Sequence, residues 1–253
     1  LPASMTGTQA WLKRALLAGE SKDTRFRMKG PLKDFPFAGD RNGVFEVRTK
    51  ASGVTLDYAD GWPPVKGIVG EAVFRGDRMD IRAQSGTTLG LQLSDVQASI
   101  ADLGNHQEHL LFKSVAKGAT PDFLRYVTGS PVGRATKGLA DEIKAVGDAR
   151  LGLEFDLPLH QLEDSVVKGE LTLQDNQVKL DPRLPPFEQF GARIAFTRND
   201  IKVSEGRALV FGEPVSFEAS NQADGGITAS IAGTLDVDRV RAMWKHPMLA
   251  FLD

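Results

Sequence analysis

The chain carries two copies of one segment, and this repeat restricts the possible fold more than any other feature of the sequence. Residues 62–83 return as residues 184–205, at a constant offset of 122 positions and without a gap. Each copy starts with two prolines, alternates apolar and polar residues, passes through a polar turn and alternates again. The pattern predicts one β-hairpin used twice. Repeated hairpins bury their apolar faces against neighbouring units, which favours an extended apolar surface over an enzyme pocket.

Strand-like alternation continues along most of the chain. It is clearest at residues 151–157, where Leu151, Leu153, Phe155 and Leu157 point one way while Glu154 and Asp156 point the other. Further strands are predicted at residues 24–29, 44–50, 53–58, 70–75, 79–83, 88–93 and 96–100. The 26 glycines and 13 prolines supply the turns between them. We therefore expect a mainly β fold: a curved antiparallel sheet, in the form of a groove or half-barrel of repeated β-hairpin units, with a few short α-helices.

Four segments have helical periodicity instead. They are residues 5–18, residues 121–127 with a proline in the first turn, residues 136–146 with Leu139, Ile143 and Val146 on one stripe, and residues 238–245. The narrow apolar stripe of residues 5–18, which includes Trp11, Leu12 and Leu16, either packs across the open end of a sheet or touches a membrane. No linker separates the two halves. We expect residues 1–253 to form a single continuous fragment of a larger repeat-groove protein.

Composition excludes several classes of function. The 31 basic and 33 acidic side chains are well mixed, so no basic stripe suited to nucleic acid is present. The absence of cysteine removes thiol nucleophiles and cysteine metal sites. No apolar run approaches the roughly 18 residues of a membrane span. Because the chain begins at Leu1 rather than Met, we expect it to be a piece of a longer protein.

No residue pattern points to catalysis or to a cofactor. His106 and His109 have a spacing that two metal ligands on a helix would share, but the preceding Gly104-Asn105 favours a solvated loop. His160 and His246 stand apart from them in the sequence, and no hydrolase, zinc-protease or dinucleotide-binding motif is present. We expect no enzyme activity, no metal and no cofactor.

Several segments together resemble the AsmA-like family of Gram-negative envelope proteins, and within it the large YhdP-type members. They are residues 30–37, 61–64, 74–81, 130–132 and 156–159, and their order and spacing carry the likeness. The resemblance implies a fragment of a long protein that is anchored in the inner membrane and crosses the periplasm. It also implies a bridge-like lipid carrier whose curved β-sheets form a gutter for acyl chains. The family's anchoring helix has no counterpart in this sequence.

Physical chemistry is compatible with such a role. A phospholipid exposes on the order of 30 methylenes, and transferring them through water costs roughly 20 kcal/mol at about 0.8 kcal/mol each. A protein route must therefore offer a continuous apolar face without a deep, specific pocket. The candidate residues for this groove are Phe26, Met28, Phe74, Met79, Ile81, Leu153, Phe155, Ile194, Phe196, Ile201 and Phe217.

Alternative interpretations remain open at this point. The same alternation is produced by the packed core of an ordinary β-sandwich. The cations Arg25, Arg27 and Lys29, and likewise Arg75, Arg78 and Arg82, belong either to a solvated outer face or to a groove rim that meets lipid phosphates.

The function that we expect is that of a periplasmic lipid-binding segment, which passes phospholipids toward the outer membrane through an apolar β-groove. Its partners would be phospholipid acyl chains and, through the parent protein, the membrane. A structural or chaperone-like factor in outer-membrane biogenesis, binding client β-segments at strand edges, is the alternative.

Overall fold

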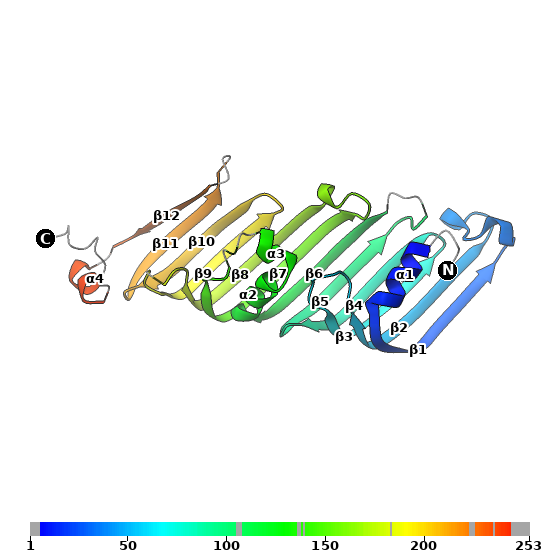
Figure 1. The fold of residues 1–253 in the computed structure, drawn as a ribbon, viewed down its shortest axis with the longest axis horizontal. Coiled ribbons are helices and arrows are strands. Elements are labelled where there is room, and N and C mark those ends of the chain that lie inside the picture. The colour runs from blue at the N-terminus through cyan, green and yellow to red at the C-terminus, as the bar shows by residue number, and fades with distance from the viewer. Residues whose placement is uncertain are drawn as a thin grey trace.

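Twelve strands form one antiparallel sheet in which spatial order equals sequence order (Figure 1). The structure is a computed structural model, and it describes residues 6–104, 108–135, 138, 140–182, 184–222, 226–234 and 236–243. Each strand pairs with its sequence neighbours, and the sheet is open rather than closed into a barrel. The predicted fold class, a curved and mainly β sheet with a few short helices, is confirmed.

The elements are bounded as follows. The strands are β1 (Leu16–Lys29), β2 (Val44–Leu56), β3 (Val65–Arg75), β4 (Arg78–Thr88), β5 (Leu91–Ile100), β6 (His109–Ala119), β7 (Lys144–Pro158), β8 (Val166–Lys179), β9 (Phe187–Thr197), β10 (Ile201–Val210), β11 (Glu213–Asn221) and β12 (Ile227–Gly233). The helices are α1 (Thr6–Ala15), α2 (Thr120–Thr128), α3 (Pro131–Ala135) and α4 (Val237–Met243), with single 3-10 turns η2 (Leu32–Asp34), η3 (Ala38–Asp40) and η4 (Leu162–Asp164).

Because each strand pairs with its neighbours in the sequence, the connections between strands lie along two long edges of the sheet. The two edges carry different connections and helices. The connections β1–β2, β3–β4, β5–β6, β7–β8, β9–β10 and β11–β12 lie along one edge, the upper one in Figure 1, which we call the hairpin edge. The other edge carries the remaining connections together with α1, α2, α3 and α4, and we call it the helix edge. Four of the eleven connections are turns of two or three residues, which is all that antiparallel neighbours need.

The repeat seen in the sequence extends over four strands on each side. Strands β2 to β5 and β8 to β11 start and end within about one residue of each other at the offset of 122. Their registers agree as well: Phe74 pairs with Met79 as Phe196 pairs with Ile201, and Gly70 pairs with Ala51 as Ala192 pairs with Leu173. The turns match too, since residues 89–90 and 211–212 all have positive φ. The chain is therefore built from a first unit, α1 with β1–β6, and a second unit, α2 and α3 with β7–β12.

β-Bulges interrupt the strands at equivalent heights in the two units. Gly53 (φ 64°) and Gly67 (φ 63°) correspond to Asp175 (φ 54°) and Gln189 (φ 49°), and the ladders shift register beside each of them. A bulge adds one residue to one strand, bends it and raises its local twist. The two rows of bulges therefore curve the sheet along its length. A sheet of twelve strands without bulges would be harder to bend.

The main core lies between α2 and the sheet. Phe123 of α2 is buried against an apolar cluster that includes Leu91, Ala116, Ala149 and Leu173. The fully buried Asn176 anchors the start of this helix: its amide donates to the carbonyls of Asp148 (2.9 Å) and Gln174 (3.0 Å), and its Oδ1 accepts a hydrogen bond from Thr120. We call the face of the sheet that carries α2 the inner face.

Four sequence predictions need correction. The strand predicted at residues 88–93 is wrong, because residues 89–90 form the turn between β4 and β5. The helix predicted at residues 5–18 ends at Ala15, where β1 already begins with Leu16. The helix predicted at residues 136–146 is wrong at its end, because residues 144–146 open β7, and the second helix is instead residues 131–135. The segments predicted as two strands at 44–50 and 53–58 are one strand, since Gly53 forms a bulge rather than a turn.

Other sequence predictions fall partly beyond the described part. Of the helix predicted at residues 238–245, the described portion belongs to α4, and Leu139, His106 and His246 lie outside the described residues. Among the described residues, no helix has the length and apolar character that crossing a bilayer requires.

Candidate functional site

The strand register brings all eleven candidate residues to one face of the sheet. Directly paired residues share a face, and one row runs Phe26, Val47, Phe74, Met79, Ile100 and Leu110 across β1 to β6. A second row runs Leu153, Gly169, Phe196 and Ile201 across β7 to β10. Alternation places Met28, Ile81, Phe155, Ile194 and Phe217 on the same side. This is the inner face, because it also carries Leu151 and Ala149, which pack in the cluster under α2.

Several aromatic rings on this face lie close to the sheet or stack on one another. A Cβ built on Gly169 would lie 2.1 Å from the Phe196 ring, and a Cβ built on Gly206 would lie 2.5 Å from the Phe217 ring. Each ring therefore covers a cross-strand glycine and lies close to the backbone of the neighbouring strand. Phe112 and Phe155 stack with ring centroids 4.4 Å apart and an interplanar angle of 8°. The result is an apolar floor on which these rings lie close to the sheet or against one another.

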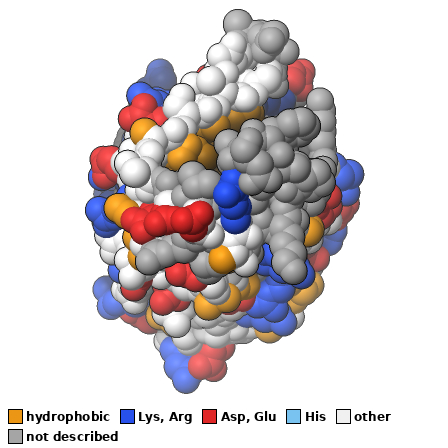
Figure 2. Space-filling view, turned by 90° about the vertical axis from the view of Figure 1, so that its left-hand side faces the viewer, with side chains coloured by type: hydrophobic (Ala, Val, Ile, Leu, Met, Phe, Trp, Pro, Cys, Tyr) orange, Lys and Arg blue, Asp and Glu red, His pale blue; other side chains and the backbone are white. Residues whose placement is uncertain are grey.

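The inner face is packed near the helix edge and more open elsewhere. Under and beside α2 the cluster residues are buried, whereas most candidate residues toward the hairpin edge are half-buried. Phe26 is 64% exposed on β1, and Ile231 is 61% exposed on β12. Figure 2 looks at the β12 end and shows hydrophobic side chains between the charged ones that surround them. Apolar surface is thus available to a ligand at both ends of the sheet.

Hydroxyl groups replace hydrocarbon at one point of the inner face. Ser21, Thr24 and Thr49 lie 2.7–2.8 Å from one another through their side-chain oxygens, on β1 and β2. Each hydroxyl donates to one neighbour and accepts from another, so the ring satisfies its own hydrogen bonds. In the second unit the positions of Thr24 and Thr49 are taken by leucines of β7 and β8.

A strap of residues 57–64, the first strap, connects β2 to β3 along the helix edge. At its start the Asp57 amide donates to the Ala15 carbonyl (2.8 Å), and the Trp11 indole donates to the Tyr58 carbonyl (3.0 Å). Toward α2, the Tyr58 and Tyr126 hydroxyls are 2.7 Å apart. The first strap thus joins α1 to α2 in front of the sheet (Figure 1).

Tyr58 of this strap and Tyr126 of α2 are partly buried. Burial, followed by the nearby Tyr126, raises the pKa of Tyr58 above its ordinary value of 10.0. Burial likewise raises the pKa of Tyr126. Both hydroxyls therefore stay neutral and hydrogen-bonded at physiological pH. The packing of Trp62 on Tyr126, with ring centroids 6.2 Å apart, adds an apolar contact beside this hydrogen bond.

The outer face carries the charges. Arg25 and Arg48 pair across β1 and β2 on the side opposite to Phe26, which places Arg25, Arg27 and Lys29 away from the apolar floor. Arg75, Arg78 and Arg82 likewise alternate with Phe74, Met79 and Ile81. Ion pairs neutralise part of this surface, for example Arg48 with Glu71 at 3.2 Å.

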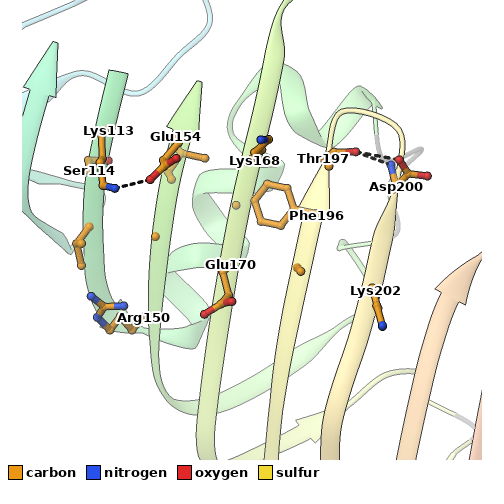
Figure 3. A pocket seen from close by; sticks show the side chains of 15 residues that line it. Lys113, Ser114, Arg150, Glu154, Lys168, Glu170, Phe196, Thr197, Asp200 and Lys202 are labelled. Carbon is orange, nitrogen blue, oxygen red and sulfur yellow. Dashed lines mark hydrogen bonds and ion pairs between the residues drawn. The ribbon is translucent and has the colours of Figure 1, made fainter. Parts of the chain in front are cut away.

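A shallow depression of about 530 Å³ opens on this outer face above Gly152, whose missing side chain leaves open space (Figure 3). Lys113, Lys168 and Lys202 surround it together with Glu154 and Glu170. The hydrogen bond from Lys113, together with its charge, lowers the pKa of the Glu154 carboxyl. A carboxylate held ionised by a lysine is a poor proton donor.

Histidines and acids form pairs rather than a metal centre. His109 Nδ1 lies 2.7 Å from Asp156, and His160 Nε2 lies 2.7 Å from Glu108. Among the described residues, no group of three or more potential ligands is close enough to hold a metal ion.

Sequence reasoning found the inner face but missed the strap contacts. Alternation reports which face a residue occupies, and this signal identified all the candidate residues. Tyr58 and Tyr126 are 68 positions apart, and no local pattern links them. Two local patterns lie near these tyrosines: the helical periodicity of residues 121–127 and the prolines after Trp62. Neither pattern indicates that the two segments are in contact.

Comparison with known proteins agrees with this architecture. The family model described as "YhdP protein" matches residues 1–253. A curated protein named "Intermembrane phospholipid transporter YhdP", from Escherichia coli (strain K12), is 23% identical over 212 residues. That match covers 84% of this chain but only 16% of the relative, so the chain spans a small part of the relative's length. No solved structure matches. The resemblance noted from the sequence is thereby confirmed, and the chain belongs to the YhdP family.

Proposed function

We propose that this chain is a lipid-binding segment that passes phospholipids along its inner face, within a periplasmic protein anchored in the inner membrane. The observation that carries the proposal is the largely apolar inner face, on which rows of apolar side chains run from strand to strand across β1 to β6 and across β7 to β10. A row of apolar side chains that continues from strand to strand lets an acyl chain move without leaving hydrocarbon, so each step exchanges equivalent contacts.

The division of charge supports the same proposal. Apolar side chains occupy the inner face, whereas Arg25, Arg48 and Lys113 belong to the outer face. Cargo with acyl chains on the floor would keep its polar head toward water at the open side of the sheet. The printed name of the E. coli relative, a phospholipid transporter, supports phospholipid as the cargo. The close packing of the floor's aromatic rings on the sheet favours many similar positions over one specific site.

Photocrosslinking tests the proposal directly. A benzophenone amino acid is placed at Phe112 or Phe155 on the inner face, and at Lys168 on the outer face of the neighbouring strand. Purified protein is irradiated in the presence of phospholipid and analysed by intact mass. We expect lipid adducts at the two inner positions and none at Lys168. Equal labelling of both faces, or labelling of neither, would contradict the proposal.

A matched pair of charge substitutions separates a lipid floor from a packed core. Phe155→Asp should lower the phospholipid recovered by organic extraction while the protein stays folded, because Phe155 is half-buried and faces the groove. Lys168→Asp introduces the same side chain on the outer face and should leave recovery unchanged. If Phe155→Asp unfolds the domain in circular dichroism melts, the residue belongs to a core, since burying a charge there costs several kcal/mol.

A further inference from the structure

The outer face of the first unit carries a group of arginines beside the hairpin edge. They belong to two neighbouring rows of directly paired residues on β1 to β4. One row is Arg25, Arg48, Val73 and Asp80, and the other is Arg27, Glu46, Arg75 and Arg78. We call the five arginines of these rows the arginine patch, and all five are exposed. Five arginines and two acids leave the rows with a net of three positive charges.

The arginines of the patch are paired with one another in a way that lowers stability. Arg25 lies directly opposite Arg48, and Arg75 lies directly opposite Arg78. Like charges that face each other across two strands destabilise a sheet. Arg25 and Arg48 each form an exposed ion pair with a neighbouring carboxylate, at 3.4 Å and 3.2 Å. Exposed ion pairs add little stability, so these arginines can exchange their carboxylates for others.

The second unit has the same backbone but a different charge pattern. Its equivalent rows are Gly152, Glu170, Ala195 and Lys202, and Glu154, Lys168, Thr197 and Asp200. Two lysines and three acids leave these rows with a net of one negative charge. Where the first unit opposes two arginines at the β3–β4 turn, the second unit joins Thr197 to Asp200 by a hydrogen bond of 3.2 Å. The shared sheet therefore does not require arginine at these positions, which indicates a role specific to the first unit.

The composition of the patch favours a protein as its partner. All cations of the two rows are arginines, whereas both cations of the equivalent rows are lysines, and protein interfaces are enriched in arginine and depleted in lysine. A guanidinium binds a carboxylate through two parallel hydrogen bonds. The half-buried Val73 offers an apolar contact within the patch. Glu46 and Asp80 would repel a uniformly anionic surface such as a membrane, whereas a protein can place neutral or basic side chains opposite them.

We propose that the arginine patch binds an acidic segment of a partner protein, whose carboxylates pair with the guanidinium groups. Complementary charge speeds the encounter of the two proteins and fixes the register in which they bind. The patch lies on the side opposite to the apolar floor, so a bound partner leaves the inner face open. The inference does not depend on lipid transport, and the two proposals can fail separately.

Fluorescence anisotropy of a labelled peptide tests the proposal. The probe is a peptide of alternating glutamate and serine, and the same peptide with glutamine in place of glutamate is the neutral control. Arg25→Gln with Arg78→Gln removes one arginine from each like-charge pair and should leave the fold intact, which circular dichroism checks. Lys168→Gln with Lys202→Gln is the matched control, because it removes the same charge from the equivalent rows of the second unit.

The protein should bind the glutamate peptide and not the glutamine peptide. The arginine variant should bind the glutamate peptide about tenfold more weakly, because it loses two charge pairs. The lysine variant should bind it as the original protein does. Equal weakening in the two variants, or no binding by the original protein, would overturn the proposal. Patch-dependent binding to phosphatidylglycerol vesicles without binding to the peptide would identify a membrane as the occupant and overturn it too.

Chemical modification of arginine tests the site without any substitution. The protein is treated with phenylglyoxal in the presence and absence of the glutamate peptide, and the modified residues are identified by mass spectrometry. We expect the peptide to protect the arginine patch. Arg150 and Arg193, which are exposed on the outer face of the second unit, should stay reactive. Equal protection of both groups, or protection of neither, would contradict the proposal.

Discussion

The two units share a backbone but fill its inner face differently. Thr49 and Ala51 of β2 correspond to Leu171 and Leu173 of β8, with the same cross-strand partners in register. In the same way Gly70 corresponds to Ala192, and Ala72 to Ile194. Of the cluster under α2, eight of its twelve buried members belong to β8, β9, β10 and β11, and only Leu91 comes from the matching strands of the first unit. The buried apolar cluster therefore belongs mainly to the second unit.

This difference shows that one set of residues determines the backbone geometry and another set determines how the inner face is filled. Bulges, turns and the two prolines recur at fixed positions and set the shape, whereas the inner-face side chains vary in size and polarity. At these four positions the first unit carries smaller side chains than the second.

The largest expected difference between the units concerns Asn176. Asn176→Val installs the residue type of its counterpart Val54 and leaves Thr120 and the carbonyls of Asp148 and Gln174 without their partner. We expect a loss of about 3 kcal/mol in the free energy of unfolding, measured by urea denaturation, because the buried Thr120 hydroxyl and two partly buried carbonyls lose their hydrogen-bond partner. Val54→Ala, at a half-buried position, should cost only about 1 kcal/mol. Equal costs would show that the second unit does not depend on this polar anchor.

Exchanging an inner-face residue between the units sharpens the comparison of their filling. Leu171→Thr should cost about 2 kcal/mol of unfolding free energy, because it removes apolar atoms that pack against the cluster. The reverse change, Thr49→Leu, should alter stability by less than about 1 kcal/mol, because the added apolar contact offsets the lost hydrogen bonds to Ser21 and Thr24. Both are read from chemical denaturation. A large loss for Thr49→Leu would mean that the first unit is as tightly packed as the second.

Alkaline pH should weaken the contact between the first strap and α2, because two tyrosine hydroxyls make it. The pKa values of Tyr58 and Tyr126 are raised in the folded state, so their contribution to stability is complete below the ordinary pKa of 10.0 and falls as pH rises above it. The loss is at most about 1.4 kcal/mol per pH unit for each tyrosine. Melting temperatures between pH 9 and about pH 11 measure it. Tyr58→Phe should make the melting temperature depend less on pH. If this variant keeps the pH dependence of the original protein, the tyrosine pair is not its cause.

The smallest expected effect concerns the bulges. Gln189 holds φ 49° where its counterpart Gly67 holds φ 63°. Because non-glycine residues pay about 1 kcal/mol for the left-handed region, Gln189→Gly should raise the free energy of unfolding by up to about 1 kcal/mol. Gly67→Gln should lower it by a similar amount, with no steric contribution, because nothing lies within 4 Å of a Cβ built there. Thermal melts of both variants measure the change, and a loss in both would show that the two bulges are not equivalent.

How far the sequence predicts this structure depends on the range of the interactions. Alternation fixes the face of Phe155 or Phe196 locally, and that part of the prediction agrees with the register. Strand limits are less predictable, because a bulge at Gly53 breaks the alternation without ending the strand. The stripe of Ile143 and Val146 resembles a helix, yet pairing with β8 holds residues 144–146 in β7. Contacts such as Tyr58 with Tyr126 depend on tertiary structure, which no single segment encodes.

The strict agreement between strand order and sequence order has a consequence for how the chain folds. Each new strand finds its partner in the strand made just before it, so the loop that must close is short and its entropic cost is small. Pairing between sequence neighbours lowers the contact order for an all-β chain, which favours faster folding. Order can then spread from one end toward the other, as in other repeat arrays. A chain of this kind is suited to folding strand by strand while it emerges, one end first, from a narrow channel.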